Sequence, residues 1–294
     1  MKGVYKMIKI KHLTKTYKRV KVVDDVTFDI NEGHCTALIG PNGAGKSTLI
    51  DMIIGDRHAN KGEILDTAQL LDSKNLGIMF QKTNFPDLIK VKELYQLFAH
   101  LYTDAITLKE FSEITLFNES QLNQYANKLS GGQKRILDFA LALIGKPQCI
   151  FLDEPTSAMD VQMRGHFWEV VTKLKDDGVT IFYTSHYIEE VERMADRVIV
   201  LEKGRVILND NPETIRTRQH TSIISLPSKY QDKVETNLSS KHFEYTLENH
   251  KIRITTTDVQ MIIEYLISIH VDLNEIEINK ASLLETVFNK EEVK

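Results

Sequence analysis

The stretch GPNGAGKST, at residues 40–48, constrains the fold of this chain more than any other part of its sequence. It fits the pattern G-x-x-x-x-G-K-[ST]. The apolar run before it, CTALI, predicts a strand, and the segment after it, 49–54, predicts a helix. In such a unit, backbone N–H groups of the loop and the N-terminus of the helix bind phosphate groups. The sequence therefore predicts an α/β fold with a phosphate-binding loop at the end of one strand.

Two side chains of this loop have predicted roles of their own. The Lys46 ammonium is expected to reach the β and γ oxygens of a nucleotide, and the Ser47 hydroxyl is expected to ligate Mg²⁺. The alternative is a chance glycine turn, and the predicted strand and helix on either side argue against it. The predicted nucleotide-binding residues of the loop are Gly40, Asn42, Gly43, Gly45, Lys46, Ser47 and Thr48.

Adjacent carboxylates follow a second buried strand, in the sequence CIFLDE at residues 149–154. The carboxyl ends of strands are where an open α/β sheet binds its ligands. Asp153, the last strand residue, is predicted to lie on the Mg²⁺ side, and Glu154 to orient or deprotonate an attacking water. An Asp-Glu pair alone is more often a solvated turn. The phosphate loop elsewhere in the chain favours the catalytic interpretation.

Further apolar runs predict more strands of the same sheet. IFYTS at 181–185 and VIVL at 198–201 are continuous and apolar, as in parallel strands that are buried on both faces. Between 149–153 and 181–185, apolar residues recur at helical spacing and predict the buried face of a helix. Residues from about 83 to 145 are predicted to form a helical subdomain.

Five ordered motifs together resemble the ATP-binding cassette family. They are GPNGAGKST, Gln81 after LGIMF, LSGGQ at 129–133, CIFLDEPTSAMD and TSH at 184–186, and they span residues 40–186. The resemblance covers about residues 1–217. It implies an α/β P-loop NTPase cassette with a mixed, mainly parallel sheet, an antiparallel β subdomain and a helical subdomain. ATP and Mg²⁺ are the cofactors that it implies.

The resemblance also implies roles for three residues outside the two motifs discussed first. Gln81 would contact Mg²⁺ and the attacking water and would sense a membrane partner. His186 would hold the γ-phosphate, and Asp160 would cross a dimer interface. Without the family, Ser185-His186 is only a lone histidine after a strand, which is more often a packed or exposed residue.

LSGGQ is a second glycine-rich loop, and it precedes a helix with an apolar face at helical spacing. Its predicted anion-binding residues are Ser130, Gly131, Gly132 and Gln133. The alternative is an ordinary capped helix with a Gly-Gly turn. One nucleotide does not need two cradles from the same lobe. We therefore expect this loop to bind the ATP of a second subunit, in a two-fold head-to-tail dimer of this chain with itself or with a paralogous cassette.

Tyr17, in the segment KTYKRV, is a candidate for stacking on adenine, as the aromatic residue of the family usually does. An ordinary half-buried strand tyrosine is the competing interpretation. In SAMD, Met159 stands where the family more often has leucine. This soft exchange of similar volume casts little doubt on the motif.

The composition changes after EKGRVILNDNPETI, and we place a domain boundary near residue 217. Residues 218–294 predict the order strand, helix, two hairpin strands, helix, strand, which is a ferredoxin-like α+β plan. A terminal helix, ASLLETVF, is predicted to follow. Its run Ser282-Leu283-Leu284-Glu285-Thr286-Val287-Phe288 resembles the end of the C-terminal domains found on ATPases of drug, peptide or polymer exporters. A helix that only closes its small domain is the compatible alternative.

The predicted function is therefore that of an ATPase subunit which powers export through separate membrane-spanning subunits, at the cytoplasmic face of the membrane. Two alternatives remain: the ATPase of an importer, and a soluble cassette ATPase acting on ribosomes or DNA. Relatives of the soluble kind usually carry two cassettes or long coiled-coil insertions, whereas this chain has one cassette and no sustained heptads. The substrate is not encoded in this chain, because its pocket belongs to the membrane partner.

Composition limits the other possibilities. A net charge of −4 over 294 residues gives no whole-chain reason to bind nucleic acid. Two cysteines, Cys35 and Cys149, lie within apolar runs and are expected to be buried reduced thiols. Uninterrupted apolar stretches of about 18 residues are missing, so the chain is not expected to span a membrane by itself.

Overall fold

The computed structural model describes residues 6–218, 222–238, 245–248 and 250–280. The chain divides into two compact units, Met1–Asn211 and Pro212–Lys294. The sequence predicts a boundary near residue 217, whereas this division assigns the seven-residue helix α8 (Pro212–Arg218) to the second unit. The two units are described separately.

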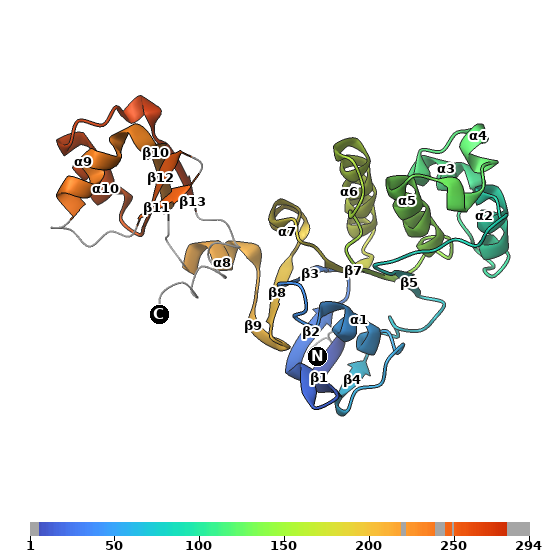
Figure 1. Cartoon of the computed structure of the whole chain (residues 1–294). Helices are drawn as coiled ribbons and strands as arrows, with labels where there is room; N and C mark the ends of the chain where they lie inside the picture. The colour runs from blue at the N-terminus through green and yellow to red at the C-terminus, as the bar shows by residue number, and fades with distance from the viewer. Residues whose placement is uncertain (1–5, 219–221, 239–244, 249, 281–294) are drawn as a thin grey trace. The chain divides into compact units, whose positions relative to one another are not determined.

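A six-stranded sheet forms the centre of the first unit (Figure 1). Its strands lie in the order β5-β6-β7-β3-β8-β9, and every neighbouring pair is parallel except β8 and β9. Their bounds are β3 (Cys35–Ile39), β5 (Leu76–Met79), β6 (Cys149–Leu152), β7 (Thr180–Thr184), β8 (Arg197–Glu202) and β9 (Arg205–Asp210). All residues of β3, β6 and β7 are buried, as their continuous apolar runs predict. The mainly parallel sheet is confirmed.

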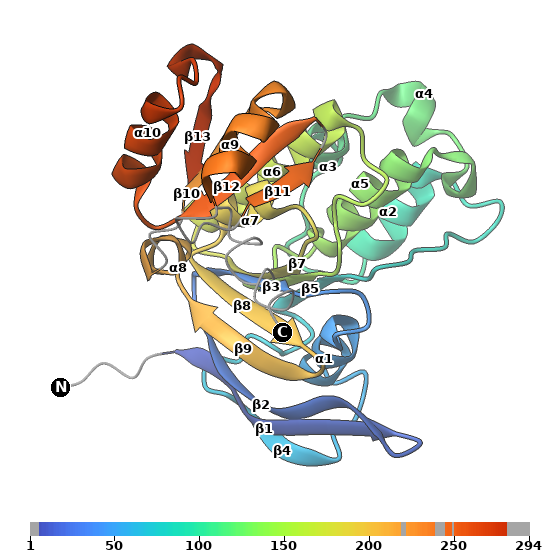
Figure 2. The ribbon, with the colours of Figure 1, turned by 60° about the vertical axis from the view of Figure 1, so that its left-hand side comes forward.

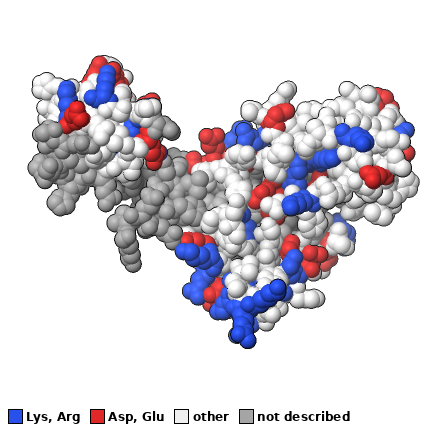
Figure 3. Space-filling view, in the orientation of Figure 1, with Lys and Arg blue, Asp and Glu red and all other residues white. Residues whose placement is uncertain are grey.

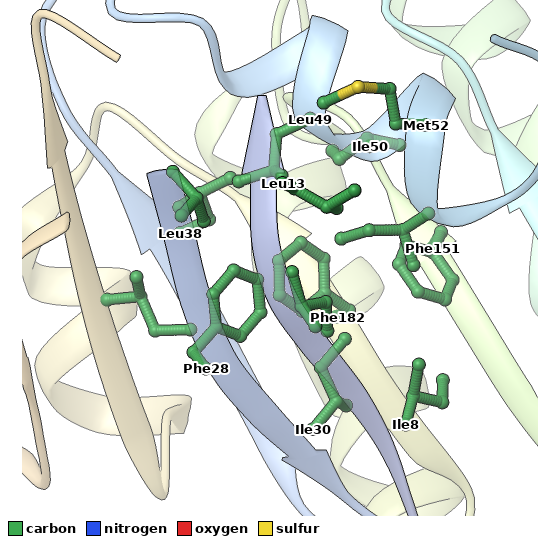
Figure 4. Packing of buried hydrophobic residues seen from close by; sticks show 14 of the residues in the cluster. Ile8, Leu13, Phe28, Ile30, Leu38, Leu49, Ile50, Met52, Phe151 and Phe182 are labelled. Carbon is green, nitrogen blue, oxygen red and sulfur yellow. The ribbon is translucent and has the colours of Figure 1, made fainter. Parts of the chain in front are cut away.

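A smaller antiparallel sheet packs against the first with helix α1 (Lys46–Ile53) beside it (Figure 1). It contains β1 (Met7–Tyr17), β2 (Val20–Asn31) and β4 (Lys61–Asp66), in the order β2-β1-β4. Phe182 of the large sheet joins the two layers, because its ring lies 6.1 Å from Phe28 of β2 and 5.1 Å from Phe151 of β6 (Figure 4). One apolar core therefore fixes both sheets and the helix that follows the phosphate loop.

Helices occupy the chain between β5 and β6, as the sequence predicts for 83–145. They are α2 (Val91–Ala99), α3 (Leu108–Thr115), α4 (Glu119–Leu122) and α5 (Gly131–Ala142), and Figure 1 shows them grouped beyond the β5 edge of the sheet. Capping boxes begin α3 at Thr107 and α4 at Asn118, where side chains bind N–H groups that the helix leaves unpaired. This group is the predicted helical subdomain.

Two helices complete the first unit, α6 (Val161–Asp176) and α7 (Ile188–Met194). The predicted apolar face of α6 points inward, with Phe167 and Val171 fully buried. Trp168 is 4% exposed and makes edge contacts with Phe167 and Tyr183, at centroid distances of 5.0 and 5.1 Å. The only tryptophan of the chain is thus a core residue of the first unit.

The second unit has an antiparallel sheet in the order β11-β12-β10-β13 (Figure 2). Its elements after α8 are β10 (Ser222–Pro227), a 3₁₀ turn (Ser228–Tyr230), α9 (Gln231–Leu238), β11 (Tyr245–Glu248), β12 (Lys251–Thr256), α10 (Val259–Ser268), a second 3₁₀ turn (Leu273–Glu275) and β13 (Glu277–Lys280). Val234 of α9 and three residues of α10 form one core with the sheet. The predicted helix at 281–288, with the run Ser282–Phe288, lies outside the described residues.

Charged side chains are mixed over much of the face in Figure 3, and Lys and Arg gather over the end of the small sheet. Two lysines of the small sheet have acidic partners: Lys11 of β1 pairs with Glu63 at 3.0 Å, and Lys21 of β2 pairs with Asp24 at 2.7 Å. Within the ranges that the structure describes, helices with the length and apolar character needed to cross a membrane are absent.

The joint between the two sheets can be tested at Phe182. We expect Phe182→Ala to lower the free energy of unfolding by about 3–5 kcal/mol, because it leaves a cavity between β2, β6 and α1. Ile207→Ala is the control, since this side chain is 47% exposed and its loss should change stability by less than about 0.5 kcal/mol. Urea unfolding followed by Trp168 fluorescence measures both. Equal effects of the two substitutions would contradict the assigned core.

Candidate functional site

Four strands of the large sheet end at one edge, and the polar residues that follow them meet there. The phosphate loop follows β3, Gln81 follows β5, Asp153 and Glu154 follow β6, and His186 follows β7. Because β5, β6, β7 and β3 are parallel neighbours, their carboxyl ends share that edge. The sequence alone did not specify this strand order.

A pocket of about 570 Å³ opens at this edge. It is lined by Val22, Asn42, Gly43, Gly45, Lys46, Ser47, Thr48, Gln81, Glu154 and His186. Nine of these ten residues are among the predicted site residues, and Val22 of β2 is the addition. Gly40 and Asp153 lie directly behind the lining, where Gly40 O accepts a hydrogen bond from Lys46 Nζ at 2.8 Å.

Backbone crowding explains two of the loop glycines. A Cβ on Gly40 would lie 2.1 Å from Leu201 O, and one on Gly45 would lie 2.4 Å from Val22 O. Gly45 also has φ +104°, which side chains disfavour. The loop is therefore closely packed between β2 and β8. Only glycine fits at these two positions.

Lys46 is held inside the loop that it serves. Its ammonium donates to Gly40 O at 2.8 Å and to Pro41 O at 3.1 Å. Burial lowers the pKa of Lys46, and the nearby carboxylates of Glu154 and Asp153 oppose that shift. The charges of Lys46, Glu154 and Asp153 therefore interact with one another at the pocket.

Glu154 is the best-placed acid–base group of the pocket. Its Oε1 lies 2.7 Å from His186 Nε2, and its carboxylate also accepts a hydrogen bond from Gln81. Burial raises the pKa of Glu154, but the hydrogen bonds from Gln81 and His186 outweigh burial, so the pKa lies below its ordinary value. The carboxylate is therefore ionised at neutral pH. It can accept a hydrogen bond from a water molecule.

The backbone of Glu154 has an unusual conformation, with φ 49°. Thr184, the last residue of β7, helps to hold it. The Glu154 N–H donates to Thr184 Oγ1 at 2.7 Å, and the same hydroxyl donates to Asp153 Oδ1 at 2.6 Å. Thr184 begins the predicted TSH motif, but it was not among the predicted site residues, because its role is to hold the backbone of another strand end.

The residues predicted to hold Mg²⁺ offer the donor atoms that this ion prefers. Ser47 supplies a hydroxyl, Gln81 an amide oxygen and Asp153 a carboxylate that is 5% exposed. In the part of the chain that the structure describes, there is no cluster of three His, Cys, Asp or Glu side chains. A site with few protein carboxylates fits Mg²⁺, which takes its other ligands from phosphates and water.

LSGGQ lies outside the pocket that the described residues form. Ser130 begins α5 with a capping box, in which Gln133 N donates to Ser130 Oγ at 3.3 Å and Ser130 N donates to Gln133 Oε1 at 3.0 Å. Gly131 and Gly132 face the loop after Glu154, since Cβ atoms there would lie 3.3 Å from Ala158 Cβ and 3.0 Å from Ala158 O. Ser130 and Gly131 are exposed.

Two other predicted residues also lie outside this lining. Asp160 is the N-cap of α6, where its Oδ1 accepts from Met163 N at 2.8 Å. Tyr17 ends β1, and its hydroxyl binds Arg57 Nη1 at 2.6 Å, with the guanidinium 5.7 Å from the ring centre. The roles of Asp160 at a dimer interface and of Tyr17 against adenine stay predictions.

Beneath the pocket, two buried charged residues escaped the sequence analysis. Arg135 of α5 donates to backbone carbonyls on both sides of the site. Glu190 of α7 binds Ser185 Oγ at 2.7 Å and Thr156 Oγ1 at 3.2 Å, and so joins the loop before His186 to the loop after Glu154. Charged residues at helical positions are usually on the surface, so their sequence positions gave no signal.

Comparisons with known proteins point to one family. The family model described as "ABC transporter" matches residues 23–157. Nod factor export ATP-binding protein I of Mesorhizobium japonicum is 36% identical over 217 residues, which cover 69% of this chain and 63% of that protein. Its counterpart in Rhizobium johnstonii is 38% identical over 221 residues, which cover 70% of each chain. The match thus spans less than two thirds of the first of these relatives.

Solved structures show the same fold. A dimeric ATP-binding cassette in a post-hydrolysis state, bound to ADP and Pi, is 28% identical and has a TM-score of 0.62, covering 70% of this chain and 98% of that one. A bacterial Atm1-family ABC exporter with ATP bound has a TM-score of 0.63 at 20% identity, covering 74% of this chain and 41% of that one. At that identity the second likeness concerns the fold alone.

Close packing of the phosphate loop generates a prediction. Gly45→Ala should lower the free energy of unfolding by about 1–3 kcal/mol through backbone strain, and it should also weaken ATP binding. Gly165→Ala is the control, because a Cβ there meets nothing within 4 Å and a helical Gly→Ala exchange adds about 0.5–1 kcal/mol of stability. Calorimetric ATP titration and urea unfolding measure the two effects. A Gly45→Ala protein that binds ATP as tightly as the parent would refute the packing argument.

Proposed function

The chain belongs to the ABC transporter family, and from that premise we propose that it is the subunit that binds and hydrolyses ATP to drive a transporter. One observation carries this proposal. A complete phosphate-binding loop and an ionised glutamate, held by a histidine and a glutamine, line the same pocket. A pocket built in this way has what phosphoryl transfer to water requires: a phosphate cradle and an acceptor for the proton of water.

The residues of the pocket divide the work of hydrolysis. The loop N–H groups and the Lys46 ammonium bind the phosphates and offset their charge. Glu154 orients the attacking water and accepts its proton, while His186 and Gln81 keep the carboxylate ionised and in place. Mg²⁺, held by Ser47, Gln81 and Asp153, would neutralise charge on the phosphate oxygens. Tyr17 is the proposed contact for adenine.

ATP is proposed to join two cassettes. LSGGQ lies at the N-terminus of α5, and a helix N-terminus can bind phosphate. The loop nevertheless lies outside the pocket of its own chain. In a two-fold dimer, Ser130 and the two glycines would contact the γ-phosphate bound to the partner, with Asp160 at the interface. A ligand specific to the closed dimer contributes about 2.7 kcal/mol at a hundred times its dissociation constant. Hydrolysis removes the γ-phosphate contacts and lets the dimer open.

Export through a separate membrane-spanning partner is the proposed direction of transport. The names of the similar relatives support export, since they are ATP-binding proteins of Nod factor export. Large apolar side chains are exposed in the segment after Gln81, where Leu88 is 77% exposed, and in the turn after α2, where Leu101 is 72% exposed. A membrane partner would cover such side chains. The subunit would then act at the cytoplasmic face of the membrane, without binding nucleic acid.

The role of Glu154 has a direct test. Glu154→Gln should lower kcat by about 10²–10⁴-fold, because an amide cannot accept the proton of water. ATP binding should persist, and ATP-bound dimers should accumulate. Glu189→Gln is the control, because that carboxylate is exposed on the neighbouring helix α7. Steady-state phosphate release and gel filtration with ATP provide the measurements. Turnover at the parent rate in Glu154→Gln would refute the assignment.

Mixing two damaged subunits tests the shared site. Lys46→Ala and Ser130→Arg proteins should each be nearly inactive alone, since every site of either homodimer lacks one half. In the mixed dimer, one site joins the intact phosphate loop of the Ser130→Arg chain to the intact LSGGQ of the Lys46→Ala chain. Partial ATPase activity should therefore return.

The control for this mixture places both substitutions in one chain and none in the other. Each site of that mixed dimer keeps one defect, so it should stay inactive apart from the parent homodimers that also form. ATP-dependent dimer formation is measured beside turnover, in case hydrolysis needs two intact sites. Absence of rescue in both measurements would mean that LSGGQ does not act on the nucleotide of a partner.

A further inference from the structure

We propose that Arg135 is a positioning residue of the hydrolytic centre, which fixes the segments that carry Gln81 and Glu154 relative to each other. The inference rests on the proposed function, because it concerns the residues that would act on the attacking water. Arg135 lies in the second turn of α5, beneath the pocket, and it is 6% exposed. A buried guanidinium is costly unless its N–H groups find acceptors.

All five N–H groups of Arg135 find such acceptors, and every acceptor is a backbone carbonyl. Nη1 donates to Phe80 O at 2.6 Å and to Gln81 O at 3.3 Å. Nη2 donates to Asp153 O at 3.0 Å and to Glu154 O at 2.9 Å, and Nε donates to Pro155 O at 3.4 Å. One planar group therefore holds the backbone of both segments at once.

The segments after β5 and β6 leave the sheet at the residues that Arg135 binds. The β5–β6 ladder ends with the pair Met79 and Leu152, and one further bond joins Asp153 N to Met79 O at 2.9 Å. Beyond that point, hydrogen bonds between the strands no longer fix the distance between the backbone of Gln81 and that of Glu154. The five hydrogen bonds of Arg135 fix this distance instead. The hydrogen bond between the side chains of Gln81 and Glu154 depends on it.

A second residue of α5 supports the same arrangement. Asp138, one turn after Arg135, accepts a hydrogen bond from the Thr83 hydroxyl, and its Oδ2 lies 3.7 Å from Arg135 Nη1. Helix α5 thus binds the segment after β5 at two places, through Arg135 at residues 80–81 and through Asp138 at Thr83. The carboxylate of Asp138 also offsets the buried charge of Arg135.

Only arginine can make this set of contacts. A guanidinium presents five donors in a rigid plane, whereas the lysine ammonium has three donors on one atom and cannot reach both segments in the same geometry. In Arg135→Lys we expect the segments to shift and kcat to fall about 10²-fold, which is the effect of a misplacement of about 1 Å in a catalytic site. KM for ATP should change much less than kcat, because the backbone N–H groups of the phosphate loop that bind the nucleotide are not held by Arg135.

The experiment compares full-length Arg135→Lys, Arg135→Ala and Leu141→Ala with the parent and with Glu154→Gln. Leu141 is buried in the same helix, 6% exposed, so its truncation loosens α5 without removing a contact of Arg135. We expect both Arg135 variants to lose kcat with a much smaller change in KM, and Leu141→Ala to lose thermal stability but to keep kcat. Millimolar guanidinium should restore part of the activity of Arg135→Ala and none in the other variants. If Arg135→Ala does not fold, Arg135→Lys decides.

The outcomes separate two failures. If Glu154→Gln is inactive while both Arg135 variants turn over at the parent rate, the inference is wrong and the proposed function stands. An equal loss of kcat in Leu141→Ala, at equal loss of thermal stability, would also overturn the inference, since the effect would then be general loosening of α5. Parent-like turnover in Glu154→Gln would overturn the proposed function, and the inference with it.

Discussion

Parallel pairing of β5, β6, β7 and β3 is the constraint on which the pocket depends. Each of these strands is followed by one part of the pocket: the phosphate loop, Gln81, Glu154 or His186. These parts lie far apart in the sequence but share one edge of the sheet. Phe182 anchors this sheet to the small antiparallel sheet, which supplies Val22 and the backbone that crowds Gly45. The hydrophobic core therefore determines the spacing of polar groups that it never touches.

Site residues could be predicted from the sequence where one local pattern indicates both the chemistry and the backbone structure. Glycines with restricted space, a lysine at a helix start and carboxylates after an apolar run each carry their own signal, and nine of the predicted residues line one pocket. Strand order left no local trace, because it follows from packing of distant segments. Arg135 could not be predicted either, since its acceptors are carbonyls that every residue has. The two compact units divide at Asn211, six residues before the predicted boundary, because α8 begins directly after β9 and belongs to the second unit.

The two glycine-rich loops of this chain lie in different structural settings. The first is built into the sheet edge beside Glu154, and the second begins a helix of the helical subdomain. Helix α5 connects them, because Ser130 of the second loop caps its N-terminus, and Arg135 of the same helix binds the backbone of Gln81 and Glu154. Under the proposed function, such a chain would offer LSGGQ to a partner and keep Glu154 in its own pocket.

The contact between Gly131, Gly132 and Ala158 limits how this surface can vary. Ideal Cβ atoms at the two glycines would lie 3.3 and 3.0 Å from Ala158 atoms, and Ala158 itself has φ 64°. Space is therefore limited between each glycine and Ala158, so a larger residue at position 131 or 132 would press against residue 158. Across homologous cassettes, the sizes of the residues at these positions should covary, even though two of them belong to one loop and the third to another.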